Sequence, residues 1–244
     1  MDVLCVFGRP IEKVNGRWAL SAYFERLSET GAHTGVRSPD IDPNADDPRI
    51  VVAGAEANAT ASALFFEKLR RKGDAPKMVV FSAGRPPYLR NDPDPTLNEA
   101  RFFKKMFLRY ADPHSSTKLV LQTQNINSYG DVFETLRLAR AKKLESVGFV
   151  TVTVHMARCK EFYRHVLRRE PSLGSVETEW FASETLLLEL SPAAYDHLWE
   201  AMISKAYART AERERRGIAA LRAGMYDFDA PGYAHTPGQL DLKK

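Results

Sequence analysis

His155 and Arg158 are the residues of this 244-residue chain whose types and spacing most directly suggest chemistry. They lie at and just beyond the end of an apolar, β-branched run, residues 149–154, that is typical of a strand buried on both faces of a parallel sheet. An imidazole can transfer protons or bind a ligand, and a guanidinium can hold a phosphate or carboxylate through two hydrogen bonds. Because ligands bind at the carboxyl edge of open α/β sheets, we expect both side chains to lie in a site there.

Small or polar residues also occupy the other junctions between a predicted strand and the helix after it. Backbone N–H groups at helix starts form anion sites, so these junctions are expected to bind a ligand. The expected ligand-binding residues are Gly54, Ser82, Ala83, Gly84, Arg85, Asn127, Ser128, Asp131, Thr151, Thr153 and Arg158. Glu99, in the first turn of its own helix, shares a face with Phe103 and Met106 and is predicted to point to the same edge. Glu99 and His155 are the candidate catalytic residues. The alternative for Glu99 is simple stabilisation by the helix dipole, worth roughly 0.3–1 kcal/mol.

Strands alternating with helices predict the fold that brings these junctions together. We predict strands at residues 49–54, 77–84, 118–122 and 149–154, and helices at 14–30, 58–72, 96–110, 131–143 and 156–167. Residues 3–7 are expected to form a short strand or a buried extended segment, whose place in the sheet the sequence does not give. This order predicts a three-layer α/β/α Rossmann-like fold with a mostly parallel sheet. Residues 176–180 and 185–190 are predicted as two further strands, at an edge or in a small antiparallel unit. The expected domain spans residues 1–190, followed by a C-terminal helical extension and irregular tail, 191–244, with Ser191 as the N-cap of the first helix.

Four motifs come in the order and approximate spacing of the YdcF/SanA/ElyC-like family: Ser82-Ala-Gly84, Asn98-Glu-Ala100, Asn127-Ser-Tyr-Gly-Asp131 and Val150-Thr-Val-Thr-Val-His-Met-Ala-Arg158. Between about residues 49 and 167 the chain resembles that family. The resemblance implies a Rossmann-like fold with a polar pocket built from these loops. It favours the soluble YdcF-type branch, because the anchor of SanA and ElyC is not seen, and it suggests S-adenosylmethionine as one possible ligand and cofactor.

The chain departs from the family pattern at four positions. Ala83 replaces the first glycine of a pair, Ser128 replaces threonine, Gly130 replaces glutamate and Asp131 replaces asparagine. The change at Asp131 removes a donor and adds a negative charge, which would repel an anionic ligand unless Arg85 or Arg158 pairs with it. A cationic ligand or a metal-bridged phosphate would tolerate this aspartate better.

Composition limits the classes of partner. The formal charge of +4 is too small to indicate nucleic acid or a membrane surface, and no apolar run approaches the roughly 20 residues of a membrane-spanning helix. Cys5 and Cys159 are expected to be buried free thiols in a cytoplasmic protein. His155 and Cys159 have metal-ligand spacing but no second pair, so no metal site is predicted. The arginine-rich run 209–222, with Glu212 and Glu214 interleaved, is predicted to be a solvated helix face.

Three functions remain open from the sequence. The leading hypothesis is a protein that binds a small nucleotide-like or phosphate-bearing ligand, with S-adenosylmethionine as one candidate. The second is a phosphate-ester hydrolase or transferase that uses a divalent ion held by Glu99 and Asp131. The third is a non-catalytic interaction protein that uses its C-terminal helix. The sequence leaves open whether the protein is an enzyme, and it does not give the oligomeric state.

Overall fold

A five-stranded parallel sheet forms the centre of the protein. The computed structural model describes residues 1–38, 40–85, 87–89, 92–125, 127–226 and 228. The strand order is β7 (Lys118–Gln122), β6 (Met78–Ser82), β1 (Val3–Phe7), β8 (Ser146–Thr151) and β9 (Glu177–Ala182), with parallel pairing throughout. All five residues of β1 are buried, as expected for a central strand covered on both faces.

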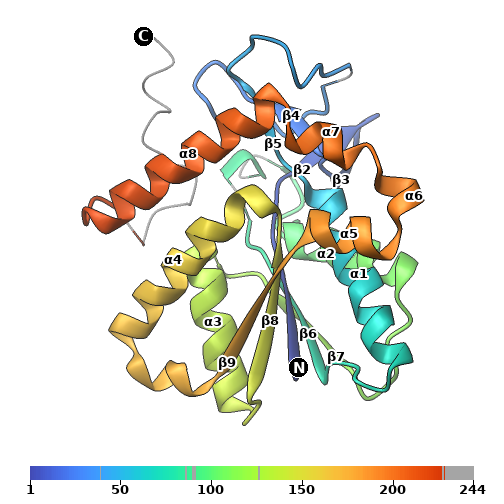
Figure 1. The fold of residues 1–244 in the computed structure, drawn as a ribbon, viewed down its shortest axis with the longest axis vertical. Helices are drawn as coiled ribbons and strands as arrows, with labels where there is room; N and C mark the ends of the chain where they lie inside the picture. Colours follow the sequence, from blue (N-terminus) through green and yellow to red (C-terminus); the bar gives the residue numbers. More distant parts are fainter. Residues whose placement is uncertain (39, 86, 90–91, 126, 227, 229–244) are drawn as a thin grey trace.

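Helices cover both faces of this sheet and produce three layers (Figure 1). Helices α1 (Ala55–Arg71), α2 (Glu99–Tyr110) and α5 (Ser183–Leu190) pack on one face, and α3 (Ser128–Ala141) and α4 (Thr153–Arg169) pack on the other. Alternate residues of β1 divide between the two cores, with Leu4 and Val6 on the α1 side and Val3, Cys5 and Phe7 on the α3 side. The predicted Rossmann-like α/β/α class is therefore confirmed.

The predicted helix at residues 14–30 is wrong. Strands β2 (Ile11–Val14) and β3 (Arg17–Leu20) form an antiparallel hairpin, and β4 (Phe24–Arg26) pairs antiparallel with β5 (Ile50–Val52). The hairpin turns at Asn15 and Gly16, both with positive φ, which is the preferred two-residue turn between strands. The predicted strand at 49–54 is present as β5, but it lies outside the parallel sheet.

Three helices of the central domain begin earlier than predicted, the first being α1, which begins at Ala55 instead of Asn58. Helix α3 begins at Ser128, where the side chain of Asn127 accepts a hydrogen bond from the Gly130 backbone. Helix α4 begins at Thr153 instead of Met156. Ser128 and His155 therefore lie in the first turns of helices that start at the carboxyl edge of the sheet.

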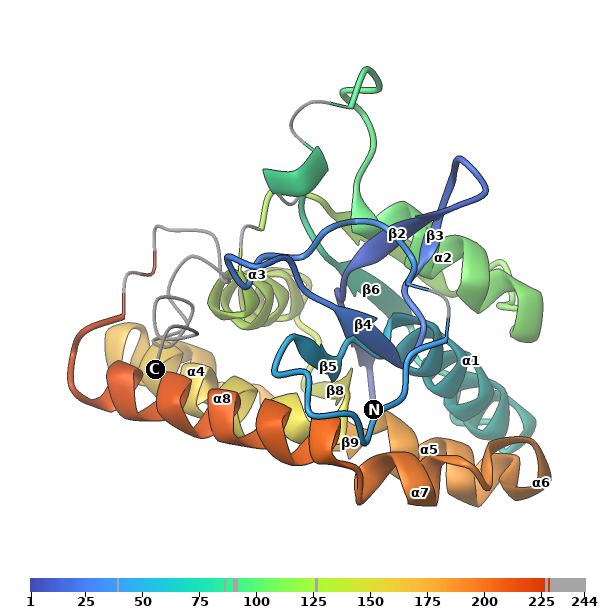
Figure 2. The same ribbon diagram turned by 90° about the horizontal axis from the view of Figure 1, so that it is seen from above.

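The C-terminal segment crosses that same edge. Residues 185–190, predicted as a strand, form α5, whereas the preceding predicted strand is present as the parallel edge strand β9. Short helices α6 (Pro192–Tyr195) and α7 (Leu198–Met202) lead to α8 (Lys205–Arg222), and the remaining short elements are 3₁₀ helices η1 (Pro87–Leu89) and η2 (Pro171–Ser175). Helix α8 packs on α4 and β5 (Figure 2). The expected irregular tail from 227 lies outside the described residues except for Phe228.

Two further sequence predictions bear on the C-terminal segment and on membranes. Ser191 precedes α6 but makes no side-chain capping hydrogen bond. The division of the chain at residue 190 stays a prediction. Across the described ranges, none of the helices combines the length and the apolar character needed to cross a bilayer.

Candidate functional site

A cavity of about 160 Å³ opens at the carboxyl edge of the sheet. Loops after β1, β6 and β7 and the first turns of α3 and α4 line it, together with residues of β5 and α8. Nine residues predicted from the sequence line this cavity: Ala83, Gly84, Arg85, Glu99, Asn127, Ser128, Asp131, His155 and Arg158. Residues up to 75 positions apart in the chain therefore meet in one site.

Four other predicted residues do not line the cavity. Gly54 precedes α1 in the left-handed region, where an added Cβ would lie 2.6 Å from Val152 Cγ1. Thr151 is completely buried at the end of β8. Thr153 donates its backbone N–H and its hydroxyl to Glu184, at 2.8 and 2.9 Å, so it anchors the start of α4. The fourth residue, Ser82, is completely buried and donates a hydrogen bond to Asp131, which does line the cavity.

Asp131 accepts hydrogen bonds from Ser82 and Asn125. Asp131 Oδ1 lies 2.9 Å from Ser82 Oγ and 3.0 Å from Asn125 Nδ2. Burial raises the pKa of Asp131 to about 7, although both hydrogen bonds act to lower it. Among the contacts of the described residues, neither Arg85 nor Arg158 pairs with Asp131. Partial protonation, and not an ion pair, therefore limits the repulsion that this aspartate exerts on an anion.

Arg85 organises a loop at the cavity wall. Its guanidinium donates to the backbone carbonyls of Leu89 and Asp94, at 2.7 and 2.6 Å, and also to those of Asp92 and Leu97. Gly84 permits the close approach of two loops, because a Cβ there would lie 1.8 Å from the Asn125 carbonyl oxygen. The loops after β6 and β7 are thus fixed relative to each other by backbone contacts.

Two consecutive hydrogen bonds at the cavity wall join Ser128, His155 and Glu214. Ser128 Oγ lies 3.0 Å from His155 Nε2, and His155 Nδ1 lies 3.1 Å from Glu214 Oε2. An ionised Glu214 can only accept, so Nδ1 carries the proton and Nε2 accepts from the Ser128 hydroxyl. Burial lowers the pKa of His155 to about 4, so this imidazole is neutral at neutral pH.

Glu214 is a buried carboxylate held by an arginine. Burial acts to raise its pKa, but Arg158 and His155 outweigh burial and hold the pKa at about 2. Arg158 Nε lies 2.9 Å from Glu214 Oε2, and both side chains are nearly buried, with exposed fractions of 12% and 11%. Gly217 makes room for this arginine, because a Cβ there would lie 3.0 Å from Arg158 Nη1.

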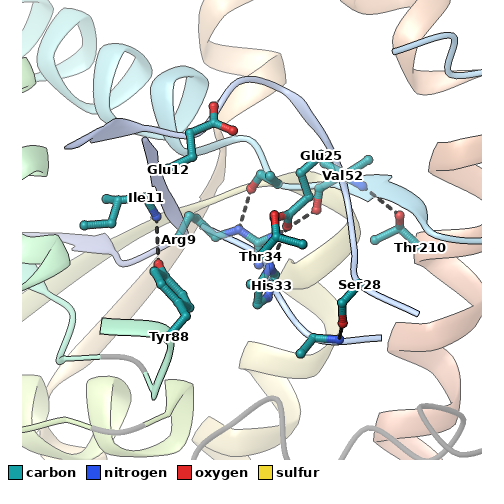
Figure 3. A network of polar contacts seen from close by, with 12 residues as sticks. Arg9, Ile11, Glu12, Glu25, Ser28, His33, Thr34, Val52, Tyr88 and Thr210 are labelled. Atoms are coloured by element: carbon teal, nitrogen blue, oxygen red, sulfur yellow. Dashed lines mark hydrogen bonds and ion pairs between the residues drawn. The ribbon is translucent and has the colours of Figure 1, made fainter. Parts of the chain in front are cut away.

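Arg9 and Arg213 add positive charge to the cavity. Arg9 donates to the backbone carbonyls of Ala53 and Val52, at 2.7 and 2.9 Å (Figure 3). These carbonyls orient the guanidinium without neutralising it. Arg213 is half-buried on α8, burial lowers its pKa, and within the described part of the chain it makes no hydrogen bond or ion pair.

Glu99 faces the cavity from the start of α2. The Tyr88 hydroxyl donates to Glu99 Oε1 at 2.8 Å. The same hydroxyl accepts a hydrogen bond from the Ile11 backbone nitrogen, which is drawn in Figure 3. Burial raises the pKa of Glu99 to about 8, with a smaller contribution from the charge of Asp131. At neutral pH the carboxyl is mostly protonated, so it is better suited to donate a hydrogen bond than to act as a base.

Sequence reasoning missed Arg9, Arg213 and Glu214. Arg9 follows Gly8 directly after β1, the same strand–glycine–arginine order as Gly84-Arg85, so the sequence contained a usable signal. The prediction that the run 209–222 is a solvated face is wrong for Glu214. This glutamate shares the buried stripe of α8 with Ala206, Thr210, Gly217 and Leu221. A carboxylate on an otherwise small and apolar stripe is the signal that was overlooked.

Cys5 and Cys159 are buried free thiols, as predicted. Over the described ranges, no three His, Cys, Asp or Glu side chains come together in an arrangement that could hold a metal ion.

Comparison with known proteins gives no family. No protein-family model matches the chain, and no curated protein or solved structure shows significant similarity to it. The resemblance to YdcF-like proteins therefore remains a prediction, and the functional argument depends on the geometry of the cavity.

Proposed function

We propose that this protein binds a small phosphate-bearing ligand in the cavity at the carboxyl edge of the sheet. The observation that carries the proposal is Arg213, a half-buried guanidinium that faces the cavity without a hydrogen bond or ion pair to any described residue. Leaving a charged donor partly desolvated and unpaired is unfavourable, and an anion that accepts its hydrogen bonds would remove that penalty.

The charges around the cavity favour an anion. Four arginines line it (Arg9, Arg85, Arg158 and Arg213). Of the three carboxyl groups in the lining, Glu214 is ionised, whereas the raised pKa values of Glu99 and Asp131 leave them largely or partly protonated at neutral pH. The lining is therefore positive overall, and its protonated carboxyls add hydrogen-bond donors for phosphate oxygens.

The cavity volume limits the part of the ligand that is enclosed. A volume of 160 Å³ is below the roughly 300–1,000 Å³ of pockets that enclose drug-sized molecules. We infer that a phosphate group occupies the cavity and that the remainder of the ligand extends through the opening. S-adenosylmethionine, suggested by the family resemblance, is less favoured because its sulfonium centre adds a positive charge beside the arginines.

Isothermal titration calorimetry with inorganic phosphate and phenyl phosphate tests the proposal. Arg213→Gln should weaken binding about 10- to 100-fold, the equivalent of one charge-assisted hydrogen bond of roughly 1.5–3 kcal/mol. Arg216→Gln is the matched control: this arginine lies on the same helix, but it is exposed and paired with Glu212. The control should bind phosphate within about twofold of the unmodified protein.

Two results would contradict phosphate binding at this site. One is the absence of heat with both phosphates in the unmodified protein. The other is equal weakening by Arg213→Gln and Arg216→Gln, which would indicate diffuse surface charge. S-adenosylmethionine titrated under the same conditions should bind more weakly than phenyl phosphate, and the reverse order would favour the alternative ligand.

A further inference from the structure

Ser128 has a geometry that simple ligand binding does not require. It is the first residue of α3, it lines the cavity and it is partly exposed there. Its hydroxyl contacts His155 Nε2, and the opposite ring nitrogen contacts Glu214. A nucleophile, a base within hydrogen-bond distance and a carboxylate that orients the base form the arrangement that activates a serine in unrelated enzymes.

We propose that Ser128 is a nucleophile that accepts the phosphoryl group of a phosphate ester bound in this cavity. The proposal rests on the phosphate binding proposed above and adds a reaction to it. His155 is the general base and then the general acid. Glu214 is a positioning residue, which holds the Nδ1-protonated tautomer of His155 and leaves Nε2 free to accept the serine proton.

The reaction proceeds in two balanced steps. In the first, Ser128 Oγ forms a bond to phosphorus while its proton moves to His155 Nε2. The ester P–O bond breaks, and the leaving alcohol takes that proton. In the second, water attacks the phosphoserine and passes its proton to His155. The Oγ–P bond then breaks, and Ser128 recovers the proton. The sum is a phosphate ester plus water giving an alcohol and phosphate.

The surroundings of Ser128 suit this chemistry. Phosphoryl transfer depends mainly on positioning and on positive charge around the transferred oxygens. Arg9, Arg158 and Arg213 line the same cavity as Ser128 and supply that charge. Ser128 also begins a 14-residue helix, whose N-terminal dipole stabilises negative charge on the serine oxygen and on the transferred group. The enclosed volume accommodates the reacting phosphate group.

A second serine–histidine pair provides an internal control. Ser116 Oγ lies 3.0 Å from His114 Nδ1 on an exposed loop, the same separation as in the pair at the cavity. Within the described part of the chain, the histidines that pair with a carboxylate are His33 and His155, and His114 is not among them. If proximity to a histidine were sufficient for reactivity, both serines would react alike.

The test uses two probes on the full chain. Diisopropyl fluorophosphate reports an activated serine: Oγ forms a bond to phosphorus, fluoride leaves and the proton passes through His155. Peptide mass spectrometry should find the diisopropylphosphoryl group on Ser128 and not on Ser116. His155→Gln should slow this labelling by at least about 100-fold. p-Nitrophenyl phosphate reports turnover, which Ser128→Ala should reduce at least about 100-fold while binding of inorganic phosphate remains.

The Glu214→Gln variant tests whether Glu214 positions His155 or contributes to substrate binding. In conditions where circular dichroism shows this variant folded, it should lower kcat for p-nitrophenyl phosphate about 10- to 100-fold and leave KM within about threefold. A merely structural glutamate would not produce that division between kcat and KM. Glu212→Gln, on the exposed face of the same helix, should change neither constant.

The outcomes separate the two proposals. Phosphate binding with neither labelling of Ser128 nor turnover would overturn the nucleophile and leave the binding proposal intact. Turnover that survives Ser128→Ala, or equal labelling of Ser116, would also overturn it. Labelling of Ser128 in a protein that does not bind phosphate would overturn the phosphate ester as substrate. Loss of binding, labelling and turnover together would remove both proposals.

Discussion

Replacement of Glu214 by glutamine should destabilise the protein far more than its position in an arginine-rich helix suggests. The carboxylate lies 2.9 Å from Arg158 Nε and 3.1 Å from His155 Nδ1, in a nearly buried position. Glutamine keeps an acceptor but removes the charge, which leaves the Arg158 guanidinium buried without a counterion. Removing one partner of a buried ion pair costs about 3–5 kcal/mol. We expect a loss of about 3 kcal/mol because one hydrogen bond is retained.

Urea unfolding followed by circular dichroism at pH 7 measures this loss. For a chain of this size it corresponds to a fall in Tm of roughly 6–12 °C. Glu212→Gln is the matched control, because that residue makes exposed ion pairs with Arg215 and Arg216. Exposed pairs contribute about 0–1 kcal/mol. A loss below about 1 kcal/mol for Glu214→Gln, equal to that of the control, would refute the buried ion pair.

The same variant predicts a dependence on pH. The pKa of Glu214 falls from 4.5 to about 2 on folding, so its contribution is fully present above about pH 4.5 and is lost as pH falls toward 2. The difference in unfolding free energy between the unmodified protein and Glu214→Gln should therefore shrink as pH decreases from 4.5. A difference that stays constant down to pH 3 would contradict the low pKa.

Three other substitutions test the framework of the site. Asp131→Asn should become progressively more stable relative to the unmodified protein from pH 4 to 7 and then level off. The reason is that folding raises the pKa of Asp131 from 3.8 to about 7, so its stabilising contribution is present below pH 3.8 and is lost as pH rises through 7. Gly84→Ala should destabilise the fold by more than about 2 kcal/mol, because its Cβ would overlap the Asn125 carbonyl oxygen. Thr210→Val should cost about 1–3 kcal/mol, because the Thr210 hydroxyl accepts the buried Val52 N–H at 2.9 Å. Urea unfolding at a series of pH values measures the change for Asp131→Asn. Urea unfolding at pH 7 measures the losses of stability for Gly84→Ala and Thr210→Val.

Each of these variants has a control of the same type. Asp112→Asn, at an exposed position, should give a pH profile parallel to that of the unmodified protein. Gly174→Ala meets no atom closer than 3.8 Å, and Thr30→Val is exposed, so both should remain within about 0.5 kcal/mol. If a test variant and its control changed stability equally, the contact assigned to that residue would not be the cause.

The three central strands of the parallel sheet were predictable because they are buried on both faces and carry continuous apolar runs. The strand at 118–122 was predicted with the bounds observed, whereas residues 3–7, expected as a strand or a buried extended segment, form the central strand β1. Residues 14–30 were misassigned because Trp18, Ala22, Tyr23 and Leu27 fit one face of a helix, whereas the Asn15-Gly16 turn determines the local structure. Residues 185–190 form a short apolar run, and such runs fit a strand and a buried helix equally well.

Nine residues of the cavity lining were predictable from where the strands end, but the chemistry of the cavity was not. Asn127, Ser128 and His155 follow strands that meet at one edge, so their proximity follows from topology. Glu214 contacts a histidine 59 positions away because α8 crosses that edge. The sequence could show that Glu214 lies on the buried stripe of α8, but local periodicity does not specify where a C-terminal helix packs. The contact of Glu214 with His155 and the position of Arg213 in the cavity, where it has no ion pair with a described residue, could therefore not be placed from the sequence.

A crystal structure with phenylphosphonate, which has no ester bond to cleave, tests the central claim most directly. We expect the phosphonate group in the cavity at the carboxyl edge, with its oxygens about 2.7–3.1 Å from the guanidinium nitrogens of Arg9 and Arg213. Phosphonate bound at another surface with this cavity unoccupied, or Arg213 paired with a protein carboxylate in place of the ligand, would contradict the account.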